Sequence, residues 1–131
     1  MLVKNYPFIK TPPGDIARPY LPITIINPEN QKEINVYALI DTGADECALP
    51  ASFASPLGYN LQSGQQNKIN TGNGITIAYT HIVCLKTFKF STGNILIDFM
   101  PNLLIPLLGV KSFLNNFILK IDYHNKIFSL I

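Results

Sequence analysis

The sequence predicts a mainly β domain, on three observations. Short runs of β-branched, aromatic and aliphatic residues recur along the whole chain, separated by clusters of Gly, Pro, Asn and Asp. One run alternates with period 2, so that a single face collects Ile34, Val36, Ala38 and Ile40. Helical spacing is confined to two short pieces, residues 51–54 and 110–117. Strands at short intervals with so little helix are typical of a mainly β fold.

Length and composition indicate one domain with its own hydrophobic core. The 131 residues are 47% hydrophobic and 14% charged, enough apolar material to fold without disulfides or metals. The net charge of +2 comes from ten basic and eight acidic residues without a basic cluster, so a nucleic-acid partner is not expected. No apolar run is long enough to span a membrane, and the N-terminus lacks a secretory apolar segment. Cys47 and Cys84 have no partners at ligand spacing, so we expect a soluble, cytoplasmic protein without metal or cofactor.

The first part of the chain predicts an arm, a hairpin and one helical turn. Residues 1–20 contain four prolines and little periodicity, so we expect an extended arm that stays loose or docks on a strand edge or partner subunit. A single domain over residues 21–131 follows. Within residues 21–41, two apolar runs flank Asn27-Pro28-Glu29-Asn30, which predicts a hairpin. Pro50 is then placed to start one helical turn.

A second hairpin is predicted at Asn73-Gly74, between strands at residues 68–72 and 75–79. This dipeptide suits a type I′ turn, whose twist matches that of the flanking strands. The ordinary interpretation is a surface hairpin, and the functional one is a flap over a cleft. The second strand is expected to continue to residue 88, and Ser91-Thr92-Gly93-Asn94 to turn the chain into another strand at residues 95–99.

The last part of the chain predicts a buried strand, a helix and a hairpin. Residues 103–109 are almost all apolar and are punctuated by Pro106, which favours a buried strand. The helix is expected over residues 110–117, because the spacing i, i+3, i+4 and i+7 is occupied by Val110, Phe113, Leu114 and Phe117. Residues 118–122 and 126–131 predict the final hairpin.

Asp41 ends the strand at residues 34–40 and is the best candidate for a catalytic group. A rigid strand fixes where the carboxylate oxygens point. Thr42 follows, and Gly43 permits a backbone geometry or a close approach that a side chain would block. The ordinary interpretation is a turn that merely ends a strand, and a lone Asp-Thr-Gly does not decide between the two.

The other candidate groups are few. His81 and His124 are isolated, and Asp98 lies between two apolar neighbours, either on an exposed strand face or paired. Hydrolysis of an amide by water needs a base and an acid, and two carboxylates that share a proton supply both. No other Asp is followed by Thr-Gly or Ser-Gly. A catalytic Asp41 therefore needs Asp41 of a second chain, brought opposite by a twofold axis.

These features resemble the retroviral-type (retropepsin-like) aspartic protease family, particularly its bacterial single-domain members. An apolar strand runs into Asp41-Thr42-Gly43-Ala44-Asp45, and a glycine-containing hairpin follows at residues 71–75. Leu107-Leu108-Gly109 then leads into the expected helix. The resemblance covers roughly residues 18–131.

The resemblance implies a closed, mostly β barrel with a flap hairpin and one short helix near the C-terminus, active as a homodimer that cleaves polypeptides without a cofactor. Asp41 of each chain would hold the lytic water, Thr42 would link the two loops across the dimer axis, and Gly43 would leave room for substrate backbone. Ala44 and Asp45 would bind substrate, and a flap centred on Gly72, Asn73 and Gly74 would close over an extended peptide. The N-terminal arm and residues 126–131 are candidates for the dimer sheet.

The chain departs from the family at one position. Retroviral members usually carry an arginine directly after the second glycine, where this chain has Val110 followed by Lys111. Lys111 or Arg18 could substitute, or the loop could be held in another way. An alternative function is a protease-like domain with weak or no turnover that binds extended peptides by strand addition. A third interpretation is an unrelated β domain with a chance Asp-Thr-Gly turn.

Overall fold

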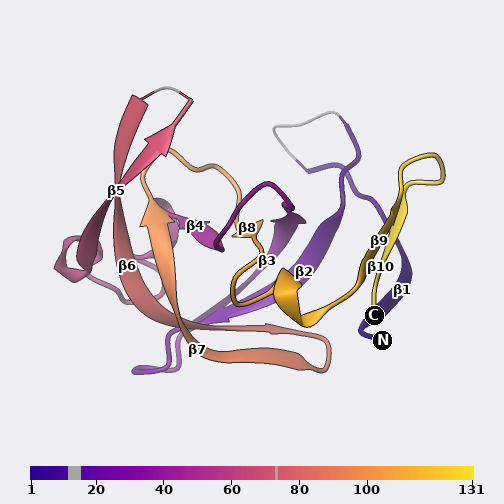
Figure 1. Cartoon of the computed structure of the whole chain (residues 1–131). Helices are drawn as coiled ribbons and strands as arrows, with labels where there is room; N and C mark the ends of the chain where they lie inside the picture. The colour runs from indigo at the N-terminus through magenta and orange to yellow at the C-terminus, as the bar shows by residue number, and fades with distance from the viewer. Residues whose placement is uncertain (12–15, 73) are drawn as a thin grey trace.

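The computed structural model describes residues 1–11, 16–72 and 74–131, which form ten strands and three short 3₁₀ turns (Figure 1). The strands are β1 (Val3–Pro7), β2 (Tyr20–Ile26), β3 (Glu33–Ile40), β4 (Ala48–Pro50), β5 (Gln65–Thr71), β6 (Gly74–Thr87), β7 (Phe90–Met100), β8 (Leu107–Leu108), β9 (Leu119–Asp122) and β10 (Ile127–Leu130). The 3₁₀ turns are η1 (Ala51–Phe53), η2 (Leu61–Ser63) and η3 (Leu114–Asn116). The prediction of a mainly β fold is confirmed.

Six of the strands close into a barrel. Their order is β2-β3-β8-β4-β7-β6, and an additional antiparallel pairing of β2 with β6 closes the ring. Strand β5 extends the sheet beyond β6 and stays outside the ring. The short strand β8 lies parallel to β3 and antiparallel to β4, so a late segment of the chain is inserted between two early ones.

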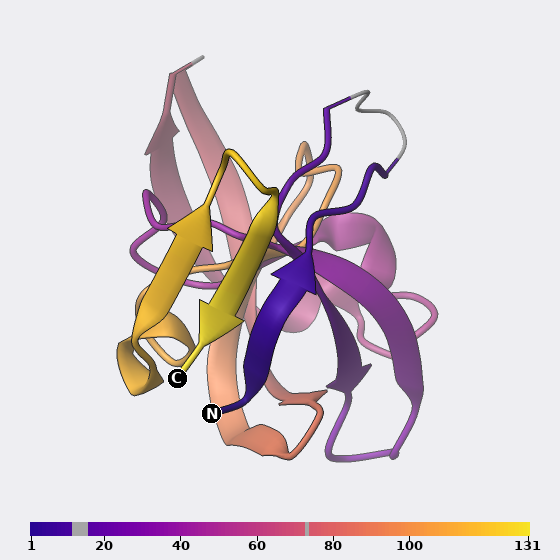
Figure 2. The same ribbon diagram turned by 90° about the vertical axis from the view of Figure 1, so that its right-hand side faces the viewer.

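The two chain ends form a separate small sheet beside the barrel, with the order β1-β10-β9 (Figure 2). The N–H of Leu2 donates to the carbonyl oxygen of Leu130 at 2.8 Å, and Val3 pairs with Leu130. Tyr6 and Phe8 stack on Phe128 with ring centroids 5.7 and 6.4 Å apart. The start of the N-terminal arm therefore docks on a strand edge of its own chain.

The core fills the barrel and continues under the terminal sheet. Its largest fully buried side chains come from elements far apart in the sequence, among them Leu21, Ile25, Leu49, Phe99, Phe113 and Phe128. Along β3 and β7 burial alternates as the period-2 pattern requires, with Ile97 and Phe99 facing inward and Leu96 and Asp98 on the other face. Burial of this apolar set is the main driving force for closing the barrel.

The expected helix at residues 110–117 is wrong. Residues 110–113 form turns, and only η3 is helical, because Ser112 has φ of 69° and Phe113 has ψ of −75°. The N–H groups of Leu114 and Asn115 donate five residues back, to Gly109 and Val110. The apolar spacing predicted burial correctly for Phe113 and Leu114, whereas Val110 is 41% exposed.

Two other boundaries differ from expectation. The chain turns at Phe88 and Lys89, not at residues 91–94, since Thr87 pairs with Phe90 and β7 runs straight on from there. Within residues 103–109 only Leu107 and Leu108 form a strand, and Leu104 is 76% exposed. The hairpins within residues 21–41 and 118–131 and the helical turn after Pro50 are confirmed.

Across the described parts of the chain, no helix has the length and apolar character needed to cross a membrane. Cys47 and Cys84 are both buried free thiols.

Candidate active site

Asp41 follows the last residue of β3, where backbone hydrogen bonds join β3 to residue 19 on one side and to residues 106–108 on the other. The N–H of Asp41 donates to the carbonyl oxygen of Leu108 at 3.1 Å, and the N–H of Ile40 donates to that of Pro19 at 3.0 Å. Leu39 is held in the same way by Pro106, at 2.9 Å. Backbone bonds on both sides of β3 thus fix the position from which the Asp41 side chain leaves.

The side chain of Asp41 folds back on the residues that follow it. Its Oδ1 accepts a hydrogen bond from the N–H of Gly43 at 3.0 Å. The backbone carbonyl oxygen of Asp41 accepts one from the N–H of Ala44 at 3.2 Å. These bonds shape residues 41–46, which we call the Asp41 loop. Asp41 is half-buried, whereas Thr42 and Gly43 are exposed. One face of the loop is therefore uncovered in the single chain.

The residues after β8 support the Asp41 loop from behind. The N–H of Val110 donates to the carbonyl oxygen of Ala44 at 3.0 Å, and that of Lys111 to Asp45 at 2.8 Å. Gly109 lies against the same backbone, since a Cβ there would come within 2.7 Å of the carbonyl oxygen of Ala44. Two main-chain bonds and one close backbone contact hold the loop.

Neither of the two candidate cations contacts the side chain of Asp45. The Lys111 Nζ lies 3.3 Å from Glu46 Oε1, with both side chains more than half exposed, and such surface pairs contribute little stability. Arg18 forms a backbone bridge with Ile9. Of the three possibilities raised by the missing arginine, the geometry matches a loop held in another way, by its backbone.

Cys47 lies directly under the loop and is 4% exposed. Its thiol donates to the carbonyl oxygen of Lys111 over 3.6 Å. Burial raises the pKa of the Cys47 thiol, partly offset by a backbone hydrogen bond at Gly109, and the nearby Glu46 carboxylate raises it further. Cys47 is therefore a neutral packing residue at physiological pH.

The β5–β6 hairpin projects from the barrel beyond the Asp41 loop (Figure 1). Its last described pair is Thr71 with Gly74, so Gly74 belongs to β6 and the turn begins one residue earlier than Asn73-Gly74. Gly72 and Gly74 are exposed, and Gly74 has φ of +113°; Asn73 lies outside the described residues. Near the tip, Ile75 is 69% exposed and Ile77 is 41% exposed. The hairpin thus carries apolar side chains that the barrel does not bury.

A pocket of about 430 Å³ lies between the Asp41 loop and β5. It brings together the predicted residues Ala44 and Asp45, whereas Asp41, Thr42, Gly43, Gly72 and Gly74 are not in its lining. The remaining lining residues were not predicted to bind substrate: Glu46, Cys47, Ala48, Ile69, Asn70, Asp98, Met100, Leu107 and Lys111. For these residues the sequence offered one signal of a site, the carboxylate of Asp98 between two apolar residues of a strand.

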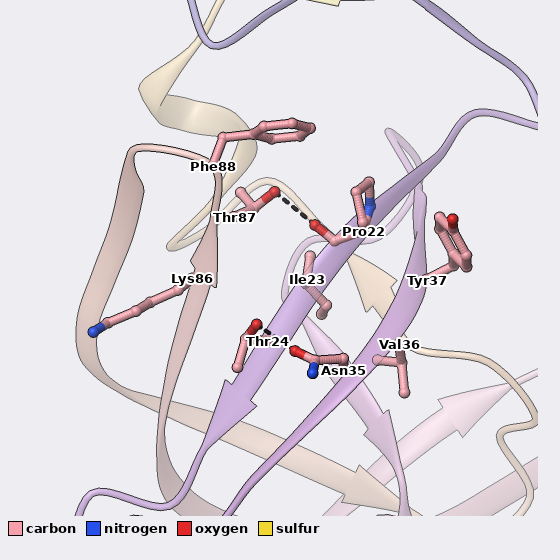
Figure 3. A pocket seen from close by; sticks show the side chains of 9 residues that line it. All are labelled: Pro22, Ile23, Thr24, Asn35, Val36, Tyr37, Lys86, Thr87 and Phe88. Atoms are coloured by element: carbon pink, nitrogen blue, oxygen red, sulfur yellow. Dashed lines mark hydrogen bonds between the residues drawn. The ribbon is translucent and has the colours of Figure 1, made fainter.

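Another cavity lies away from the Asp41 loop. It measures about 580 Å³ and opens between β2, β3 and the end of β6, lined by residues that include Val36, Tyr37 and Phe88 (Figure 3). Its two threonine hydroxyls are already engaged, with Thr24 donating to Asn35 at 2.6 Å and Thr87 to the carbonyl oxygen of Pro22 at 2.7 Å. No carboxylate lines it. Acid–base hydrolysis therefore has no groups to work with there, and the Asp41 loop is the better candidate.

The chain is similar to two solved protease structures. The chain matches a retropepsin-like aspartic protease from Rickettsia conorii with a TM-score of 0.68 and 22% identity, over 97% of this chain and 99% of that one. It matches the EIAV protease, solved with the inhibitor HBY-793, with a TM-score of 0.56 and 20% identity, over 82% of this chain and 93% of that one. A comparison with curated proteins gave no match.

The closed six-stranded barrel is the fold of retropepsin-like aspartic proteases. The family model described as "gag-polyprotein putative aspartyl protease" matches residues 29–116, a span that contains the Asp41 loop, the β5–β6 hairpin and β8. The chain belongs to this family.

Proposed function

We propose that the protein is a homodimeric aspartic endopeptidase in which Asp41 of two chains activates water between them. The observation that carries the proposal is the Asp41 loop itself. A single carboxylate leaves a rigid strand end, and the residues beside it, Thr42 and Gly43, are exposed in one chain. A second copy placed across a twofold axis would cover that face and supply the missing carboxylate.

The proposed reaction is general acid–base hydrolysis. One Asp41 carboxylate removes a proton from water as it attacks the peptide carbonyl carbon, and the other, protonated, donates to the carbonyl oxygen. The tetrahedral intermediate then collapses as the leaving nitrogen takes a proton from the pair. Because water attacks the substrate directly and the two carboxylates supply both base and acid, the reaction needs no covalent enzyme intermediate and no cofactor. Activity is expected between the two macroscopic pKa values of the pair, in acidic to near-neutral solution.

The other site residues take binding roles in this proposal. Thr42 would link the two loops across the axis, and Gly43 would leave space for the substrate backbone. Ala44 and Asp45 line the pocket beside β5, which supports their contact with substrate. Gly72, Asn73 and Gly74 would close over the peptide at the tip of the β5–β6 hairpin. A cytoplasmic setting, where thiols stay reduced, agrees with the two free cysteines.

The decisive experiment compares wild type with Asp41→Asn on a mixed peptide library, across about pH 4 to 7, where a coupled carboxylate pair changes its proton count. We expect wild type to cleave and the variant to lose cleavage, because an amide cannot act as the base. Sedimentation of both proteins checks that the dimer persists. A folded wild-type dimer that binds peptides and cleaves none of them would refute the peptidase and support a peptide-binding domain.

A further inference from the structure

The pocket between the Asp41 loop and β5 combines apolar walls with carboxylates. Ala48, Ile69, Met100 and Leu107 supply aliphatic surface, and the acids are Asp45, Glu46 and Asp98. Lys111 is the only cation in the lining, and its amine is engaged by Glu46 at 3.3 Å. The carboxylates of Asp45 and Asp98 therefore line the pocket without a salt bridge to a cation, within the part of the chain that the structure describes.

Asp98 lies at the centre of this arrangement. It lies near the C-terminal end of β7, where it pairs with Ala48 of β4 on one side and with Thr80 of β6 on the other. Because side chains alternate along a strand, Asp98 and Met100 reach the pocket while Ile97 and Phe99 fill the core. A carboxylate at this position is carried by a strand that is paired on both sides, so its backbone cannot move far.

The hydrogen bonds of Asp98 leave part of its capacity unused. Its Oδ1 accepts from the Thr80 hydroxyl at 2.6 Å and from the Asn67 amide at 3.4 Å. Asn67 also donates to Thr80 at 2.6 Å, so the three side chains orient one another. Both donors are neutral, and among the described residues they reach only one of the two oxygens. A carboxylate accepts at both oxygens, so Oδ2 can receive a further donor.

From these contacts we infer that the pocket selects a cationic side chain, a lysine or arginine of the substrate, and that Asp98 is the specificity-determining residue. The aliphatic stem of such a side chain packs on the apolar walls while its charged head reaches the carboxylates. A glutamate in the same place meets like charge, and a norleucine leaves the carboxylates without a partner. The inference rests on the proposed function, because the pocket binds substrate only if peptide lies along the Asp41 loop.

The test uses peptide sets that differ at one residue, with lysine, norleucine or glutamate placed in turn at each position near the scissile bond. For wild type we expect one position at which lysine is favoured over norleucine in kcat/KM by roughly tenfold, the size of a charge-assisted hydrogen bond. In Asp98→Asn the ratio at that position should fall to about one. In Glu33→Gln, which removes an exposed carboxylate at the start of β3, the ratio should stay as in wild type.

Two further measurements keep the inference independent of turnover and of folding defects. Binding of the same peptides to the Asp41→Asn protein should show the lysine preference without cleavage. In wild type the preference should shrink as salt is raised, because ions screen the attraction at a partly open pocket. A wild type that cleaves with no lysine preference at any position, or a preference that survives in Asp98→Asn, would overturn the inference and leave the peptidase standing. Binding without preference and without cleavage would overturn both.

Discussion

Gly109 shapes the Asp41 loop because it has no side chain. A Cβ at this position would lie 2.6 Å from the carbonyl carbon of Glu46 and 2.7 Å from the carbonyl oxygen of Ala44. Both neighbours are backbone atoms, so no rotamer change can relieve the contact. The loop and the chain after β8 can approach closely only while residue 109 is glycine.

Gly109→Ala is therefore expected to push the Asp41 loop away from its support. Overpacking of this kind costs about 1–3 kcal/mol in the free energy of unfolding, and the displaced Asp41 should lower kcat more than it raises KM. Urea unfolding and steady-state kinetics measure the two effects.

Gly72→Ala is the matched control, since nothing lies within 4 Å of a Cβ at that position. Its unfolding free energy should change by only a few tenths of a kcal/mol. Equal stability of the two variants and wild type would show that the loop tolerates a side chain at position 109.

Among single residues, the sequence predicted Asp41 as the candidate catalytic group because a buried strand leads directly into it, and this stays a prediction. Asp98 was recognised only as a polar residue in an apolar strand, since alternation does not say whether the opposite face meets solvent or a pocket. That depends on β4 and β6, which lie beside β7 but are distant in sequence. The backbone support of the loop by Val110 and Lys111 was equally out of reach, because main-chain bonds carry no residue signature.

The β5–β6 hairpin shows how elements divide the work between scaffold and site. Strand β6 is 14 residues long, and its second half pairs with β7 and β2 in the barrel. Its first residues pair with β5 alone and hold the exposed Ile75 and Ile77. Apolar side chains left outside the core at this position are suited to covering a bound peptide.

Ile75→Ser is expected to raise KM roughly tenfold, the value of burying one aliphatic side chain against a ligand, with little change in stability. Ile75 is 69% exposed in the free chain, so the core loses nothing. Peptide kinetics and thermal unfolding measure the two quantities.

Ile82→Ser serves as the control, because Ile82 is 53% exposed on the same strand but lies in the barrel part, opposite Leu96. Its KM should match that of wild type. A KM that rises equally in both variants, or in neither, would contradict a substrate contact at Ile75.

Hairpins were predicted well where turn chemistry was local, as at Asn27-Pro28-Glu29-Asn30. The turn expected at residues 91–94 does not form there, because these residues lie within β7 and their hydroxyls bind nearby backbone N–H groups. Thr92 Oγ1 accepts from the N–H of Leu85 at 3.0 Å and Ser91 Oγ accepts from that of Gly93 at 3.1 Å. Hydroxyls and a glycine with φ of +67° accommodate an irregularity within β7, and the same residue types would also make a turn.

As a whole, the molecule completes its terminal sheet within one chain. Strands β1, β10 and β9 pair with one another, and Ile118 and Ile131 exchange both backbone hydrogen bonds at 2.9 Å. In the proposed dimer, the exposed face of the Asp41 loop would therefore form the interface, and the edge strands β1 and β9 could add contacts to it. Folding of one chain and assembly of the site are separable steps.

Mixing wild type with Asp41→Asn tests whether each site is shared. At equal amounts and with free subunit exchange, random pairing leaves activity per wild-type chain at roughly half, because mixed dimers hold one carboxylate. An activity assay after incubation measures this value.

Glu33→Gln is the control for this mixing, since its carboxylate is exposed and lies at the opposite end of β3 from the Asp41 loop. Its addition should increase the total activity. Total activity that stays proportional to the amount of wild type when Asp41→Asn is added would show that one chain carries a complete site.

The closure of the barrel was not predictable from the residues alone. Leu107 and Leu108 gave an apolar run, but nothing in it indicated a strand inserted between β3 and β4. The resemblance to known proteases supplied the closed fold, and the pairing of β2 with β6 confirms it.

The pairing pattern along β6 also determines how its free end can move. From Gly74 to Ala78 the strand has β5 as its only neighbour, and from Tyr79 onward β7 joins it. Five residues of β6, about 16 Å at the usual rise of a strand, are thus paired with β5 alone, and β7 fixes the hairpin at its base. A small bend near Tyr79 and Gln66 is amplified at the tip. The pairing with β7 at Tyr79, more than the glycines of the hairpin, therefore limits how far Ile75 and Ile77 can be displaced.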